Sequence, residues 1–124
     1  MIPDDVRRFV LTSIPSVPYL EAALLLRRAA REHSDEEVAR ALYVSRAHAG
    51  ALLEELHRAG LVTLRRDDGL HSRYQPRDQE LAQAFGSLAR HYEIDTIGIT
   101  HLIHDASGKS AVRFADAFKI RKDS

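Results

Sequence analysis

The side chains best suited to bind a charged ligand gather in one short segment, residues 61–77. This segment contains four arginines and two aspartates, whereas the whole chain of 124 residues carries 18 basic and 18 acidic side chains and has no net charge. Guanidinium groups bind phosphate oxygens through paired hydrogen bonds, and neutralised phosphates supply much of the affinity of nucleic-acid-binding proteins. A surface for nucleic acid would therefore be local on this chain, and Arg65, Arg66 and Arg73 are its first candidates.

Other kinds of chemistry find little support in the sequence. The absence of cysteine excludes disulfides, thiolate metal ligands and cysteine nucleophiles. His91, His101 and His104 are spaced as histidines on helix surfaces rather than as a zinc site, so we expect no metal. Residues 107–110, Ser-Gly-Lys-Ser, end like a phosphate-binding loop, but Ile103 stands where that motif requires a glycine. No nucleophile, base and orienting acid are spaced for catalysis, so we expect neither an enzyme nor a cofactor.

Helical periodicity dominates the first third of the chain. Pro3 and the two aspartates after it mark a helix start, and apolar residues then recur at helical spacing until Pro15 ends the run. Ser16 is positioned to cap a second helix that continues to near Glu32. This second helix is apolar around most of its circumference, so we expect it to be central and buried.

Two further helices follow, joined by a tight turn. Ser34 and Glu37 form a capping box ahead of a short helix, and Ser45 is a candidate N-cap for a longer helix over about 46–59. Gly60 stands where a helix end requires a positive φ. A short and a longer helix joined by about three residues are the signature of a helix-turn-helix.

Directly after the fourth helix, the apolar period changes from that of a helix to that of a strand. Val62 and Leu64 alternate with polar residues, the turn residues 67–69 follow, and a second alternating run ends at Pro76. We therefore expect a β-hairpin over about 61–76. A hairpin appended to a helix-turn-helix is a wing, so the predicted fold is mainly α: a winged helix-turn-helix with a two-stranded β wing and C-terminal helices.

The core of this pattern resembles winged helix-turn-helix bacterial regulators of the MarR-like type. The resemblance lies in the segment Ser34–Leu42, the pair Val44-Ser45 and the segment Leu52–Val62, and it covers residues 17–77, about half of the chain. In such regulators a leucine followed by Gly-Leu-Val ends the recognition helix and begins the wing. The corresponding residues here are Leu56, Gly60, Leu61 and Val62.

The resemblance implies a DNA-binding transcriptional regulator that acts as a homodimer. Its recognition helix, about 46–59, would enter the major groove of double-stranded DNA, and its wing, about 61–76, would lie on the backbone. The predicted DNA-contact residues, on the helix and then on the wing, are Ser45, Arg46, His48, Arg65, Arg66 and Arg73.

Four residues of the recognition helix depart from what this function favours. Gly50 and Ala51 stand where such regulators often have polar or basic side chains, and Glu54 and Glu55 would repel phosphates. These departures keep an alternative open, namely a winged-helix module that binds other proteins as an adaptor or antagonist of the transcription machinery. A small-molecule effector is compatible with a regulator, but no site for one is visible in the sequence.

The residues after the wing exceed what a winged-helix core needs. Asp78 is positioned to cap a helix that carries an apolar seam, and this seam is too apolar to stay exposed. β-branched residues leave 94–104 open between helix and strand, although we favour a helix that extends the seam, and a short final helix is expected over about 111–118. We expect the seam residues to form a dimer interface: Leu81, Phe85, Leu88 and Tyr92.

We expect the chain to form a single domain with two parts. Residues 1–77 form the DNA-binding core with its N-terminal helix, and residues 78–124 are a dimerisation extension of the same single domain. The longest apolar run, Ala22–Leu26, cannot span a bilayer, and charged residues occupy the place of a signal-peptide core. We therefore expect a cytoplasmic protein with no membrane partner, and its richness in alanine and arginine suggests a bacterial source.

Overall fold

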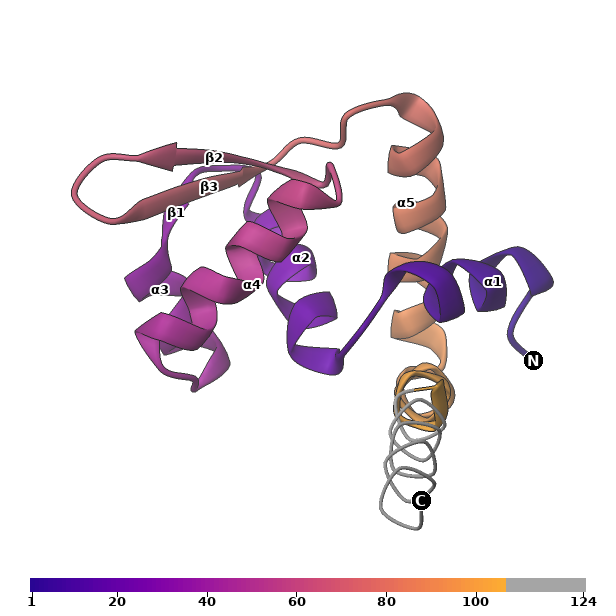
Figure 1. Ribbon diagram of the computed structural model, residues 1–124. Coiled ribbons are helices and arrows are strands. Elements are labelled where there is room, and N and C mark those ends of the chain that lie inside the picture. Colours follow the sequence, from indigo (N-terminus) through magenta and orange to yellow (C-terminus); the bar gives the residue numbers. More distant parts are fainter. Residues whose placement is uncertain (107–124) are drawn as a thin grey trace, which may run out of the picture.

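The computed structural model describes residues 1–106 and shows five helices, a small sheet and one further helix (Figure 1). In chain order the elements are α1 (Asp4–Ser13), α2 (Val17–Ala29), β1 (His33–Ser34), α3 (Asp35–Leu42), α4 (Arg46–Arg58), β2 (Val62–Arg66), β3 (Leu70–Tyr74) and α5 (Gln79–Ile94). A last helix covers 96–106. This order confirms the predicted mainly α winged helix-turn-helix.

Side-chain caps fix where four of the helices begin, as the sequence predicted. The hydroxyl oxygen of Ser16 accepts a hydrogen bond from the backbone of Tyr19, and Ser34 and Glu37 form the complete capping box of α3. Asp78 caps α5 by accepting from the backbone N–H of Leu81 at 2.8 Å. Each cap satisfies a backbone donor that a helix start leaves free, so the helix boundaries follow from local sequence.

The second helix, α2, is the centre of the core. It packs against α3, α4 and β3, and its residues Leu20, Ala22, Ala23 and Leu26 have no exposed surface. The predicted central position of this helix is confirmed.

Among residues 1–106, no single helix is long and apolar enough to cross a membrane. The pair α1 and α2, bent by 110° at the break between them, meets the requirements for a membrane span by length and composition only.

The sheet has one strand more than the sequence predicted. It is antiparallel with the order β1-β3-β2, and the added strand β1 pairs His33 with Ser72 and Ser34 with His71. A strand of two residues is too short for a visible alternation, and its second residue also belongs to the capping box of α3. The short strand ties the segment before the helix-turn-helix to β3, which becomes the middle strand of the sheet.

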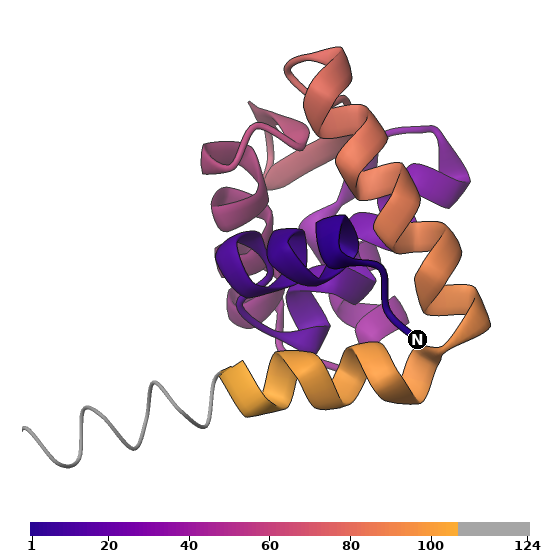
Figure 2. The ribbon, with the colours of Figure 1, turned by 90° about the vertical axis from the view of Figure 1, so that its right-hand side faces the viewer.

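The segment after α5 is helical, but it does not continue α5. Asp95 interrupts the helix with φ −141° and ψ 67°, and its carboxylate accepts from the backbone of Gly98 at 2.9 Å, which caps the next helix. Figure 2 shows that the helix over 96–106 runs in a different direction from α5. The expected extension of one seam is therefore wrong. Ile99 and Ile103 instead turn inward and are buried.

The rest of the C-terminal predictions lies outside the described residues. This applies to the segment 107–110 and to the expected final helix over about 111–118, with Phe114 and Phe118. Residues 105 and 106, directly before this part of the chain, are still helical.

Candidate nucleic-acid interface

The recognition helix α4 has one buried and one exposed side. Ala49, Leu52, Leu53 and Leu56 face the core, so the opposite side of the helix exposes Ala47, Ala51 and Arg58. Small side chains thus occupy the centre of the exposed face.

Three of the predicted contact residues, Ser45, Arg46 and His48, lie at the N-terminus of α4. The hydroxyl oxygen of Ser45 accepts a hydrogen bond from the backbone N–H of His48 at 3.0 Å. Ser45 is therefore already used as the cap, although its side chain stays exposed, and the His48 side chain is exposed as well. Both are accessible to a ligand placed against the start of the helix.

The wing lies alongside α4, and Gly50 is where the two approach each other. A Cβ atom on Gly50 would contact the Leu70 side chain at 3.6 Å, which is ordinary packing distance. A longer side chain would push the hairpin away from the helix. Similar regulators often have a larger polar residue at the position of Gly50. The contact with Leu70 is a structural reason for a glycine there.

Arg46 is held between α3 and the turn of the wing. Its Nε lies 3.2 Å from Oδ1 of Asp35, a side chain that is only 10% exposed, and the same oxygen accepts from the backbone of Glu36 at 2.8 Å. Burial alone would raise the pKa of Asp35, but hydrogen bonding and charge attraction from Arg46 outweigh it and leave the pKa below its usual value. At Gly69, which has φ +102°, a Cβ atom would lie 2.7 Å from Nη2 of Arg46, so only glycine fits there.

Arg65 and Arg66 lie on opposite faces of the hairpin. Residues paired across an antiparallel sheet share a face, and the register pairs Arg65 with His71 and Arg66 with Leu70. Since Leu70 packs on α4, Arg66 faces the recognition helix, whereas Arg65 lies on the outer face with Arg73.

Each of these wing arginines already binds an acceptor of the same chain. Arg65 contacts Glu32 at 2.7 Å and Asp67 at 2.9 Å, and Arg66 contacts Glu54 at 2.7 Å. Arg73 donates to the backbone carbonyl of Ala30 at 3.1 Å. The hydrogen bond from Arg65 lowers the pKa of Glu32, and that from Arg66 lowers the pKa of Glu54. The hairpin thus carries paired, not free, guanidinium groups.

The structure places all six predicted contact residues on the wing or at the adjoining start of α4, and the four arginines among them are bound to acceptors of the same chain. The pairing of Arg65 with Glu32 and of Arg66 with Glu54 was not predicted, because these acids are 33 and 12 residues away from the arginines that they bind. A signal existed only for Glu54, whose charge was noted as repulsive to phosphates. Its ion pair with Arg66 offsets that charge.

The residues predicted to form a dimer interface divide into two groups. Phe85 and Leu88 have no exposed surface because they pack into the core of the single chain, which leaves them nothing to offer a second copy. Leu81 and Tyr92 are partly exposed, and the Tyr92 hydroxyl donates to Glu21 at 2.6 Å.

Large apolar side chains that are exposed lie close to this seam. Ile94 and Ile97, at the junction of α5 with the last helix, are 80% and 72% exposed, and Leu11 on α1 is 51% exposed.

In residues 1–106, no three side chains of the His, Cys, Asp or Glu types form a group that would hold a metal ion.

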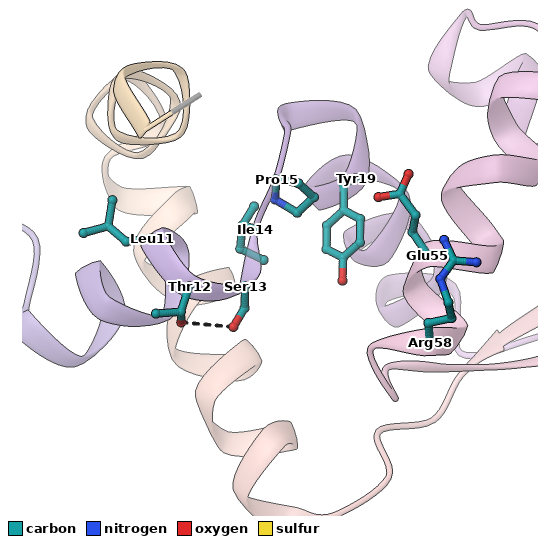
Figure 3. Close-up of a pocket in the computed structure, with 8 residues that line it drawn as sticks. All are labelled: Leu11, Thr12, Ser13, Ile14, Pro15, Tyr19, Glu55 and Arg58. Carbon is teal, nitrogen blue, oxygen red and sulfur yellow. Dashed lines mark hydrogen bonds between the residues drawn. The ribbon is translucent and has the colours of Figure 1, made fainter. Parts of the chain in front are cut away.

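A cavity of about 460 Å³ lies between α1, α2 and α4. Figure 3 shows the Tyr19 side chain pointing into it from α2, with Glu55 and Arg58 of α4 on one side and the end of α1 on the other. Burial, and after it the charge of Glu55, raises the pKa of Tyr19 to about 12. None of the predicted DNA-contact residues lines this cavity.

Comparison with known proteins finds similarity in structure only. No family model matches the sequence, and no curated protein is significantly similar to it. Sco5413, a MarR family transcriptional regulator from Streptomyces coelicolor, superposes with a TM-score of 0.59 at 17% identity, over 95% of this chain and 83% of that one.

Two further solved structures show the same likeness. The homodimeric winged helix-turn-helix DNA-binding domain of Mb0332 from Mycobacterium bovis, a possible ArsR-family transcriptional regulator, has a TM-score of 0.54 at 23% identity, over 75% of this chain and 82% of that one. A mutant of MarR from E. coli has a TM-score of 0.53 at 12% identity, over 92% and 82% of the two chains. The chain therefore has a winged helix-turn-helix fold and resembles MarR-family and ArsR-like transcriptional regulators in its architecture.

Proposed function

We propose that this chain is a DNA-binding transcriptional regulator, with α4 in the major groove and the β2–β3 hairpin on the DNA backbone. The observation that carries the proposal is the position of Arg46. It lies at the first turn of α4, is bound to Asp35 and sits against Gly69 in the turn of the wing. Helix start and wing tip thus form one continuous surface, as a duplex that contacts both would require.

The contact residues divide by the groups that they would meet. Arg65, Arg66 and Arg73 would bind phosphates, which positions the protein without selecting a sequence. Arg46 and His48 would reach base edges from the N-terminus of α4, with Ser45 beside them. Ala47 and Ala51 allow a close approach of the helix and would leave apolar contacts, such as those to thymine methyl groups.

We further propose that the regulator acts as a homodimer through residues 78–120. Leu81 and Tyr92 would supply surface, together with the exposed Ile94 and Ile97, while the buried seam residues hold α5 against the core. The domain of Mb0332, which has a similar fold, is homodimeric. A two-fold axis would place two recognition helices in major grooves about 34–36 Å apart.

Such a regulator would work in the bacterial cytoplasm and without a cofactor. If a small molecule controlled its DNA binding, that molecule would need a site away from the DNA. The cavity beside Tyr19 meets this condition, since it touches α4 but contains none of the predicted DNA-contact residues. Its lining combines hydroxyls with both signs of charge, so a small polar ligand would fit it better than an apolar one.

A salt titration of duplex binding tests the proposed function. Fluorescence anisotropy with random and genomic duplexes should show binding that weakens steeply with salt, and selection from random duplexes should yield a two-fold-symmetric site. The alternative, a winged-helix module for other proteins, is favoured by the zero net charge and by the paired arginines. It predicts no duplex binding even at low salt.

A further inference from the structure

Carboxylates hold the two adjacent arginines of β2 on both faces of the hairpin: Glu32, with Asp67 of the turn beside it, binds Arg65, and Glu54 binds Arg66. Both oxygens of Glu32, in the segment between α2 and β1, accept from Arg65, at 2.7 Å from Nη2 and 3.2 Å from Nε. On the other face, Oε1 of Glu54 on α4 accepts from Nη2 of Arg66 at 2.7 Å. The pairs therefore fasten the hairpin on one side to the segment before β1 and on the other to the recognition helix.

These pairs lie at the surface, where a competing anion can reach them. The side chains of Arg65 and Glu32 are 49% and 42% exposed, and those of Arg66 and Glu54 are 68% and 38% exposed. A carboxylate that accepts two hydrogen bonds from one guanidinium presents the same kind of acceptors as a phosphate. Glu32 and a DNA phosphate therefore cannot both occupy the same edge of Arg65.

We propose that Glu32 and Glu54 occupy the wing arginines in the free protein in place of DNA phosphates, and so set how tightly the chain binds any duplex. The inference rests on the proposed function and deepens it. Duplex binding exchanges each carboxylate for a phosphate, so the arginines contribute less affinity than free arginines would. The exchange costs the same free energy on every duplex whose phosphates the wing contacts. A duplex that also fits α4 stays bound despite this cost, whereas binding to random DNA, which lacks the contacts of α4, falls to low occupancy.

The test uses the full chain and removes each charge without changing the shape of the side chain. Glu32→Gln, Glu54→Gln and the double variant are compared with wild type in anisotropy titrations on random duplex and on a selected site. Each substitution should tighten binding to random duplex by about two- to fivefold, the range expected for an exposed ion pair. Binding to the selected site should tighten by a similar factor, because the wing contacts phosphates in both complexes. The salt slope on random duplex should steepen, because a released carboxylate no longer takes up a cation.

Two controls separate this effect from a general change of charge. Asp5→Asn makes the same change of carboxylate to amide at an exposed residue in the first turn of α1, an element that lies away from the hairpin (Figure 1), and should have a smaller effect. In an Arg65→Ala background, Glu32→Gln should no longer tighten binding beyond this control, because no guanidinium is freed.

Each result of these titrations either supports the inference or contradicts it. If wild type binds duplex and the glutamine variants bind random duplex no more tightly than the Asp5→Asn control, the carboxylates position the arginines and the inference fails alone. If neither wild type nor the double variant binds any duplex, the inference and the proposed function both fail. Binding that is detectable only in the double variant supports the inference.

Discussion

Arg66 on β2 and Glu54 on α4 form an ion pair at 2.7 Å that joins the wing to the recognition helix. The pair changes the meaning of an acid in the middle of that helix. A lone carboxylate facing DNA would repel phosphates, but one that is bound to a guanidinium is largely neutralised. In the free protein the exposed face of α4 therefore carries less uncompensated negative charge than its sequence predicts.

The double substitution Arg65→Ala with Arg66→Ala should weaken binding to every duplex. It removes two phosphate contacts and leaves Glu32 and Glu54 unpaired near the backbone. The salt dependence of the affinity should flatten by up to about two units of slope. Anisotropy titrations between low and moderate salt measure both quantities.

The matched control is Arg7→Ala with Arg8→Ala, which removes two adjacent exposed arginines from α1. Because α1 lies away from the hairpin (Figure 1), this variant should keep most of the affinity. Equal losses in the two double variants would contradict a specific role for the wing.

Arg46→Ala should change sequence preference rather than binding in general. Its guanidinium at the start of α4 is the group best placed for a paired contact with guanine, and its loss should cost about 1–3 kcal/mol at one position of the site. Selection of binding sites from a random pool, with wild type in parallel, measures the preference. Equal losses on selected and random duplexes would make Arg46 a phosphate contact instead.

Local signals explain why much of the fold could be predicted from the sequence. The caps at Ser16, Ser34 and Asp78 bind backbone groups only three residues away, and the hairpin follows from alternation around a turn. Such interactions need no knowledge of the rest of the chain.

The features that escaped prediction depend on distant residues or on competition between signals. The partner of Arg65 lies 33 residues earlier, and strand β1 exists only because β3 is there to pair with it. Near Asp95, helical periodicity favoured one long helix, but a side chain that caps the next helix interrupted it. The candidate site was thus predictable as a set of arginines, and its acidic half was not.

Asp35→Asn should destabilise the fold near neutral pH. Asp35 is buried and accepts hydrogen bonds from Arg46 and from the backbone of Glu36, and the loss of a charged acceptor costs about 1–3 kcal/mol. Its pKa is lowered in the folded state, so its stabilisation is present above the ordinary carboxyl pKa and is lost as pH falls through the folded value. Urea unfolding should show a difference between variant and wild type at pH 7 that shrinks in acid. A difference independent of pH would contradict this account.

Ile94→Glu with Ile97→Glu should shift the chain from dimer to monomer and leave its fold intact. Both side chains are mostly exposed in the single chain, so added charge costs little there but opposes an apolar contact between copies. Sedimentation at low micromolar concentration measures the shift. Tyr43→Glu is the matched control, since Tyr43 is 95% exposed in the turn between α3 and α4. A wild-type chain that is already monomeric would contradict the proposed dimer.

Buried residues of the seam should respond differently from these exposed ones. Phe85→Ala should cost about 3–5 kcal/mol of stability, since Phe85 has no exposed surface and its ring lies 5.7 Å from that of Tyr74. Thermal unfolding distinguishes this loss of packing from the loss of a dimer contact, because only the latter leaves the monomer folded.

Two substitutions at Gly50 should distinguish the effect of helix stability on duplex binding from the effect of the position of the wing. Gly50→Ala adds a Cβ that meets Leu70 at an ordinary 3.6 Å, so it should stabilise α4 by about 0.5–1 kcal/mol and leave duplex binding nearly unchanged. Gly50→Leu has a similar helix propensity, but its longer side chain must displace Leu70 and with it the hairpin. It should therefore weaken duplex binding while the helix content, measured by circular dichroism, stays that of the alanine variant. Equal duplex affinity in the two variants would show that the position of the wing on α4 does not matter for binding.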